Sequence, residues 1–113
     1  MPEIKNFAST AEWSLAADQF VRAGCRYHML RTFSTEAAAA LPAVDFVFID
    51  GLHTYEGVVA DIDAYYPKMA AGGVMIFNDY GSAHYPGVTR AVDEFVAREG
   101  LRLRKKWHDM ILC

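Results

Sequence analysis

Two unbroken apolar runs constrain the fold of this chain more than any other feature of its sequence. Phe46–Ile49 leads directly into Asp50, and Val74–Phe77 leads into Asn78 and Asp79. Neither run alternates with polar residues, a pattern typical of strands buried on both faces, as in parallel sheets. The runs therefore predict two parallel strands whose carboxyl ends carry polar side chains.

Helical patterns alternate with these strands, which predicts an α/β fold. A capping box, Ser9 with Glu12, begins the first helix, and Gly24 supplies a left-handed stop. Ser34 and Thr35 are predicted to cap a short helix. The predicted helices cover residues 9–24, 34–41, 55–69 and 86–100; the predicted strands cover 25–33, 44–50 and 74–77, with a closing antiparallel pair within 101–113 and a turn at 70–73.

Length and composition predict a single domain over residues 1–113: helix, strand and short helix in 1–43, a strand–helix–strand–helix core in 44–100, and closing strands in 101–113. The net charge is −3 and no basic face is evident, which argues against a nucleic-acid partner. No apolar run approaches the ~20 residues of a membrane span, and no signal peptide is recognisable. A cytoplasmic protein without a membrane partner is expected.

The polar residues after the two strands predict a ligand site. In open α/β sheets ligands bind beyond the carboxyl ends of the strands, so Asp50, Asn78 and Asp79 should converge if the strands are neighbours. Three oxygen ligands with open positions suit Mg²⁺ or a similar divalent cation. His53 is close enough in sequence to act as a base. Each residue alone could equally be a cap or turn residue.

The sequence resembles a known family from Val44 to about Val96. "FIDGLHTYEGVVADIDAYYPKMAAGGVMIFNDYG" followed by "PGVTRAVDEF" is similar to the C-terminal half of class I S-adenosylmethionine-dependent methyltransferases. The most similar branch holds macrocin-type sugar O-methyltransferases and cephalosporin-hydroxylase-like proteins. The resemblance implies a Rossmann-like sheet with helices on both faces, S-adenosylmethionine as cofactor and a small-molecule acceptor.

Site roles follow from this resemblance position by position. It implies divalent-metal ligands at Asp50, Asn78 and Asp79, although many relatives carry His or an acid in place of Asn78. It implies a general base at His53. The remaining implied positions are the cofactor contacts Ser34, Asp50 and Gly51, and the acceptor loop with His84 and Tyr85.

The sequence differs from the family in its N-terminal part. The glycine-rich turn that follows the family's first strand has no match in residues 1–30, so the resemblance implies a truncated methyltransferase with part of the cofactor pocket. The strand at 44–50 would then keep an unpaired edge, which favours association. A homo-oligomer through this edge is expected. Two alternatives stay open: a non-catalytic self-association module and a small metal-dependent hydrolase.

Overall fold

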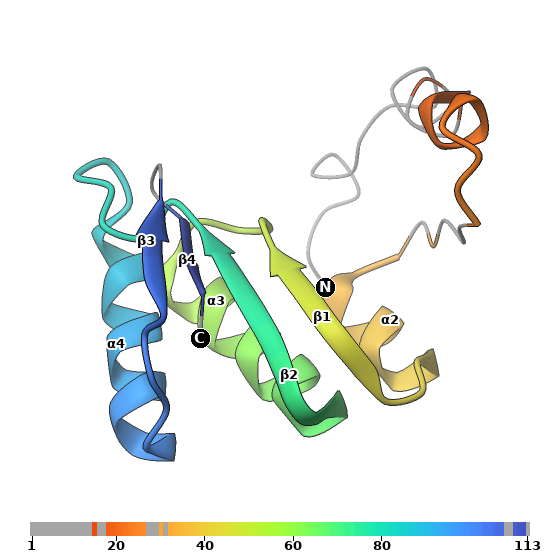
Figure 1. Ribbon diagram of the computed structural model, residues 1–113. Helices are drawn as coiled ribbons and strands as arrows, with labels where there is room; N and C mark the ends of the chain where they lie inside the picture. The colour runs from red at the N-terminus through yellow and green to blue at the C-terminus, as the bar shows by residue number, and fades with distance from the viewer. Residues whose placement is uncertain (1–14, 16–17, 27–29, 31, 108–109, 113) are drawn as a thin grey trace. The chain divides into compact units, whose positions relative to one another are not determined.

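The computed structural model describes residues 15, 18–26, 30, 32–107 and 110–112 (Figure 1). The chain divides into two compact units, Met1–Thr32 and Phe33–Cys113. In the first unit residues 18–22 are helical, and the helix ends at Gly24, whose φ is +69°. The predicted left-handed stop is therefore confirmed. The predicted capping box lies outside the described residues. The prediction of a strand at 25–33 is wrong for the residues described there, 25–26, 30 and 32–33, none of which is in a strand.

The second unit is built on a four-stranded sheet in the order β1-β2-β4-β3. β1 (Val44–Ile49) pairs in parallel with β2 (Met69–Asn78), which confirms that the two apolar runs are neighbouring strands. β4 (Met110–Leu112) is antiparallel to both β2 and β3 (Lys105–Trp107), so the predicted closing pair is also confirmed.

The segment predicted as a turn at 70–73 lies inside β2. Val44 is paired with Met69, whereas Phe46 is paired with Val74, so four residues of β2 stand opposite Asp45 alone. Gly72 has a φ of +77° within this irregularity, a backbone conformation that favours glycine. The chain turns here as predicted, but strand pairing continues on both sides of the turn.

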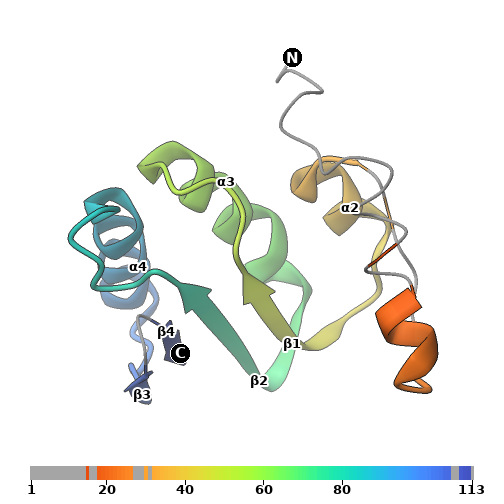
Figure 2. The same cartoon turned by 90° about the horizontal axis from the view of Figure 1, so that it is seen from above.

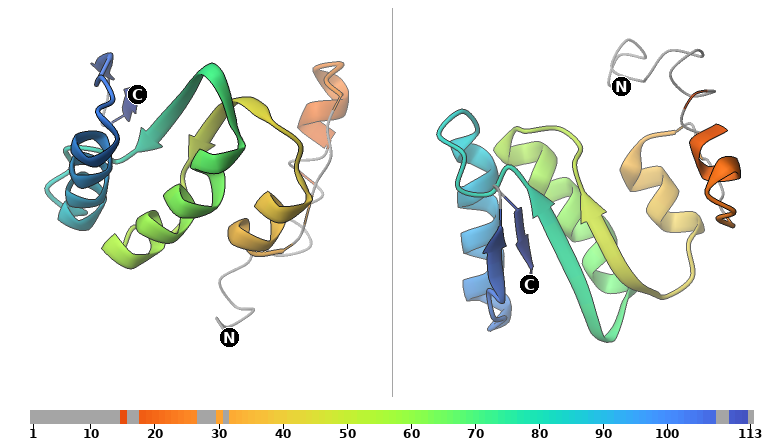
Figure 3. Two further views of the ribbon diagram at one scale, coloured as in Figure 1. Left: turned by 90° about the horizontal axis from the view of Figure 1, so that it is seen from below. Right: turned by 45° about the horizontal axis from the view of Figure 1, so that its top comes forward.

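The three helices of this unit lie side by side over one face of the sheet (Figures 2 and 3). They are α2 (Ser34–Ala40), α3 (Tyr55–Tyr65), which continues into the 3-10 turn η2 (Tyr66–Lys68), and α4 (Pro86–Glu99). Each begins close to its predicted position. The α/β class is confirmed. The described helices of this unit cover one face of the sheet, whereas the resemblance implies helices on both faces.

The ends of the helices follow from short-range signals. The Thr54 side chain accepts a hydrogen bond from the Gly57 amide at 3.1 Å and caps α3, Pro86 occupies the first turn of α4, and Gly100 ends α4 with a φ of +64°. The predicted cap of α2 is wrong: Ser34 is already helical, and the N-cap is Phe33, which makes no side-chain capping bond.

The core lies between the helices and one face of β1 and β2. Its fully buried side chains include Phe77 from β2, Ile62 from α3, and Val92 and Phe95 from α4. The ring of Phe95 packs edge-on against Phe77 and against Tyr66 in η2. This core fixes the carboxyl ends of β1 and β2 beside the amino ends of α3 and α4.

The other face of β1 carries two exposed aromatic side chains, Phe46 (58% exposed) and Phe48 (47%). The unbroken apolar pattern predicts cover on both faces, but the described helices of this unit cover only one. β1 is also at the edge of the described sheet, where β2 is its one partner strand.

Within the described part of the chain, no helix has the length and apolar character needed to span a membrane.

Candidate functional site

The carboxyl ends of β1 and β2 bring three polar side chains together. Ile49 is in register with Phe77, so the next residues, Asp50 and Asn78, lie at the same edge of the sheet. The Asn78 side-chain amide donates to Asp50 Oδ1 at 2.8 Å and to Asp79 Oδ2 at 3.2 Å. The predicted convergence is therefore observed, with the Asn78 nitrogen between the two carboxylates.

His53 joins this group from the loop between β1 and α3. Its Nε2 atom lies 2.6 Å from Asp79 Oδ2 and 3.6 Å from Asp50 Oδ1. Ligand atoms of Asp50, His53 and Asp79 all lie within 4.8 Å of one another, close enough to share one cation. The side chains are 46%, 35% and 22% exposed respectively, so a solvent-borne ligand has access to them.

The backbone at Asp79 explains how its carboxylate reaches His53. Asp79 has a φ of +63°, and among the described residues it is the one non-glycine residue in the left-handed region. Aspartate tolerates this conformation better than most residues, though at some cost in strain. The Asp79 carbonyl accepts from the Ser82 amide at 3.1 Å, which closes the turn. Strand β2 thus ends in a sharp turn that directs a carboxylate into the site.

The loop after this turn is held against α4. The Gly81 amide donates to Thr89 Oγ1 at 2.7 Å, and the Tyr80 hydroxyl donates to Asp93 Oδ1 at 2.6 Å. Both acceptors are side chains of α4. The loop that carries the predicted acceptor residues is therefore anchored on a rigid element.

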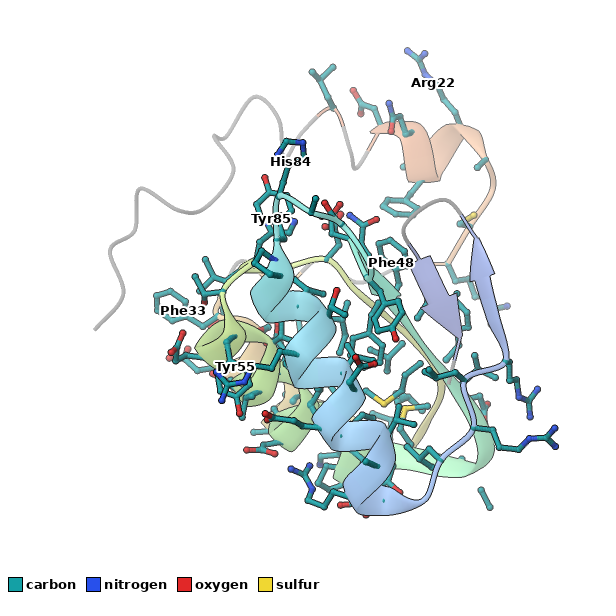
Figure 4. All side chains as sticks on the ribbon, turned by 90° about the vertical axis from the view of Figure 1, so that its left-hand side faces the viewer. Arg22, Phe33, Phe48, Tyr55, His84 and Tyr85 are labelled. Carbon is teal, nitrogen blue, oxygen red and sulfur yellow. The ribbon has the colours of Figure 1, made fainter. Side chains whose placement is uncertain are left out.

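The two acceptor-loop residues differ in position. The Tyr85 ring stacks on the His53 ring, with centroids 4.2 Å apart and planes inclined by 24°. His84 is exposed at the tip of the loop, with its ring 6.5 Å from that of Tyr85 (Figure 4). The structure therefore brings Tyr85 to the site and leaves His84 at its outer margin.

Ser34 and Gly51, the two other predicted cofactor contacts, both lie beside Asp61, a residue that was not predicted from the sequence. The Ser34 hydroxyl donates to Asp61 Oδ1, and a Cβ atom added to Gly51 would lie 3.0 Å from Asp61 Oδ2. The Tyr65 hydroxyl donates to the Ser34 carbonyl at 2.7 Å. α3 therefore links the start of α2 to the tip of β1.

Asp61 is the one charged side chain that is buried among the described residues, at 6% exposure. Burial raises its pKa because desolvation disfavours the carboxylate, and the Ser34 hydrogen bond offsets part of this rise. The sequence feature that could have identified Asp61 is its place on the buried side of α3, between Val58 and Ile62. An acid at such a position needs a partner, but the sequence does not show which one.

We expect replacement of Asp61 by asparagine to change how stability depends on pH. The raised pKa means that the folded chain holds this proton more tightly than the unfolded chain. The stabilisation that comes from this tighter proton binding is fully present below the ordinary aspartate pKa, and it is lost as the pH rises through the raised pKa of Asp61. Because asparagine stays neutral and still accepts from Ser34, the stability of Asp61→Asn relative to wild type should increase from acid to neutral pH.

Urea unfolding at several pH values measures this difference. Asp63→Asn is the matched control, because Asp63 is an exposed acid on the same helix. A stability difference between Asp61→Asn and wild type that stays constant over the pH range would contradict the prediction.

The comparisons with known proteins agree with this fold. A family model described as a methyltransferase domain matches residues 4–80, which is more than half of the chain. The chain therefore belongs to the methyltransferase family, and it corresponds to the C-terminal part of a class I S-adenosylmethionine-dependent methyltransferase. The family predicted from the sequence is thus confirmed.

Individual relatives are similar over parts of their length. The O-methyltransferase NovP has a similar structure, with a TM-score of 0.58 and 28% identity over 66% of this chain and 30% of NovP. "Uncharacterized protein R132" of Acanthamoeba polyphaga mimivirus is 40% identical over 55 residues, which are 48% of this chain and 25% of that protein. The chain thus matches only about a quarter to a third of the length of these relatives.

Proposed function

We propose that this chain carries the metal-binding and acceptor-binding side of an S-adenosylmethionine-dependent O-methyltransferase that acts on a hydroxyl of a small molecule. The observation that carries the proposal is the cluster of Asp50, His53 and Asp79 at the carboxyl ends of β1 and β2, in a chain of the methyltransferase family. The likeness to the O-methyltransferase NovP supports oxygen as the acceptor atom.

The donor set fits a divalent cation such as Mg²⁺. Asp50 and Asp79 provide carboxylate oxygens, the ligands that hard cations prefer. As placed, Asn78 presents its amide nitrogen to both carboxylates. A half-turn of this amide would present its oxygen and complete the predicted set. A bound cation lowers the pKa of a hydroxyl that coordinates it.

In this proposal the chain's own residues position the acceptor and take its proton. Asp50 and Asp79 orient the hydroxyl, and His53 accepts the proton that the hydroxyl loses. S-adenosylmethionine, when bound, would supply the methyl group to the acceptor oxygen, and its sulfur would keep the electron pair of the broken carbon–sulfur bond. Tyr85 and His84 border the acceptor.

The described residues fit one side of a cofactor site. Ser34, Asp50 and Gly51 lie at the ends of neighbouring elements, and Ser34 and Gly51 both lie beside Asp61. The sequence contains no match to the family's glycine-rich turn within residues 1–30. We therefore propose that the chain alone holds only part of the cofactor pocket and is inactive.

Titration of the chain with Mn²⁺, followed by displacement with Mg²⁺, tests the metal part of this proposal. We expect saturable binding that Mg²⁺ reverses. Addition of S-adenosylhomocysteine tests the cofactor part, and we expect no binding up to about 1 mM, a dissociation constant that corresponds to about 4 kcal/mol. Absence of cation binding would contradict metal assistance, whereas micromolar cofactor binding would show that the chain or its assembly completes the pocket.

A second function, non-catalytic self-association, is favoured by the edge of β1. No second strand borders β1 among the described residues, and Phe46 and Phe48 are exposed on it. An exposed apolar edge strand is a template for pairing with another chain. We propose a second copy of this chain as the partner. Sedimentation over a range of concentrations tests it, and a monomer at every concentration would contradict it.

A further inference from the structure

We propose that Thr89 and Asp93 of α4 are positioning residues: they hold the turn at the end of β2 and thereby keep the Asp79 carboxylate directed into the site. This inference deepens the proposed function and rests on it, because Asp79 is one of the two carboxylates assigned there to the cation. Two hydrogen bonds between α4 and the residues that follow Asp79 carry it, together with the left-handed backbone of Asp79 itself.

The backbone of Asp79 needs support from its surroundings. Its φ of +63° lies in the left-handed region, where a residue with a side chain persists only when neighbouring contacts enforce the conformation. The direction of the Cα–Cβ bond follows from the backbone torsion angles. Relaxation of φ to a negative value would therefore turn the carboxylate away from His53, whose Nε2 atom lies 2.6 Å from Asp79 Oδ2.

Two side chains of α4 provide this support. The Gly81 amide donates to Thr89 Oγ1 at 2.7 Å. The Tyr80 hydroxyl donates to Asp93 Oδ1 at 2.6 Å. Both acceptors lie on the same side of the helix, because residues four apart are neighbours on a helix surface. Asp79 is thus held on both sides, since the residue before it belongs to β2 and the two residues after it are fixed to α4.

α4 is a firm support because its other side is buried in the core. Val88, Val92 and Phe95 are buried side chains of this helix. Near its start, a Cβ atom added to Gly87 would lie 2.7 Å from the Tyr55 amide nitrogen, so α4 also packs closely against the first residue of α3. Figure 4 shows the loop after β2 at the amino end of α4. A residue bonded to α4 is therefore held in place relative to the site.

Three substitutions that leave the charge unchanged isolate the two bonds. Thr89→Val replaces the hydroxyl by a methyl group and removes the acceptor of the Gly81 amide, whereas Thr89→Ser keeps a hydroxyl. Tyr80→Phe removes the bond to Asp93 and keeps the ring. Because Gly81 and Asp93 are exposed, water can replace either lost bond, and neither change leaves a buried group unpaired.

Ser82→Ala is the matched control. It also removes a hydroxyl that accepts from a backbone amide in this loop, but that amide belongs to His84, further along the chain from Asp79. The backbone bond between the Ser82 amide and the Asp79 carbonyl is retained. We expect this variant to behave as wild type in every measurement below.

NMR without any cation tests the positioning role directly. In wild type we expect carbon-13 shifts of Asp79 that are characteristic of a left-handed backbone, and slow hydrogen exchange of the Ser82 amide. In the combined variant Thr89→Val/Tyr80→Phe, the Asp79 shifts should move away from these values and the Ser82 amide should exchange faster. The amide of Val92, inside α4, should exchange as in wild type.

Titration with Mn²⁺ measures the consequence for the site. We expect the combined variant to bind Mn²⁺ about 10-fold more weakly than wild type, the lower end of the range for residues that orient metal ligands. Thr89→Ser should bind Mn²⁺ as wild type does. A merely structural role for Thr89 and Asp93 would lower the melting temperature of the combined variant without changing the Asp79 shifts or the Mn²⁺ affinity.

The outcomes separate this inference from the proposed function. Unchanged Asp79 shifts in the folded combined variant, or an unchanged affinity where wild type binds Mn²⁺, would each overturn the positioning role. Absence of Mn²⁺ binding by wild type would contradict the metal part of the proposed function, and the NMR measurements would still decide the positioning role. If the combined variant does not fold, the two single variants, each with one bond lost, provide the same comparison.

Discussion

Replacement of Phe95 by alanine is expected to lower the free energy of unfolding by about 3–5 kcal/mol, the range for removal of a buried aromatic side chain. Phe95 is 1% exposed on α4, and its ring packs edge-on against Phe77 of β2 and Tyr66 of η2. Loss of the ring would leave a cavity where a helix, the sheet and η2 meet. For a domain of ordinary stability, about 5–15 kcal/mol, this change removes a large share of the total.

Phe48→Ala is the matched control for this prediction. It also removes a phenylalanine side chain, but from the face of β1 that the described helices do not cover, where Phe48 is 47% exposed. We expect a loss of no more than about 1 kcal/mol, because a half-exposed ring buries less apolar area and leaves no closed cavity. Urea unfolding measures both variants. Equal losses would show that the face of β1 carrying Phe48 is covered in solution.

The strands and helices of this fold were predictable because their signals are local. Apolar continuity identified β1 and the C-terminal part of β2, and Pro86 and Gly100 marked the ends of α4. Prediction of the α2 cap failed because Ser34 has a long-range partner. Its hydroxyl bonds to Asp61, 27 residues away, and tertiary contacts of this kind leave no trace in capping patterns.

The location of the site could be predicted from the sequence, but the arrangement of its side chains could not. Two strands that end in acids predicted that Asp50 and Asp79 converge. The sequence could not show that Asp79 adopts a left-handed backbone, that Asn78 directs its nitrogen to the carboxylates, or that a ring stacks on His53. These features depend on turn geometry and on the packing of α4, which one sequence does not specify. The roles predicted for these residues stay predictions.

Replacement of Asp79 by asparagine is expected to weaken divalent-cation binding by about 10–100-fold, the equivalent of one lost charge-assisted contact of about 1.5–3 kcal/mol. Asparagine tolerates the left-handed backbone that Asp79 adopts, at a φ of +63°, so the turn should survive. The change removes one of the two carboxylates while the side chain keeps its size. Titration with Mn²⁺ measures the affinity, and Asp63→Asn is the control for loss of one negative charge elsewhere on the surface.

The stability of Asp79→Asn separates a functional role of this residue from a structural one. Its contact with His53 is partly exposed, and ion pairs of this kind contribute about 0–1 kcal/mol. Removal of one carboxylate also relieves the repulsion between Asp79 and Asp50. We therefore expect the free energy of unfolding to fall by no more than about 1 kcal/mol. A large loss of stability with unchanged Mn²⁺ affinity would mean that the strained turn at the end of β2 serves the fold rather than a bound cation.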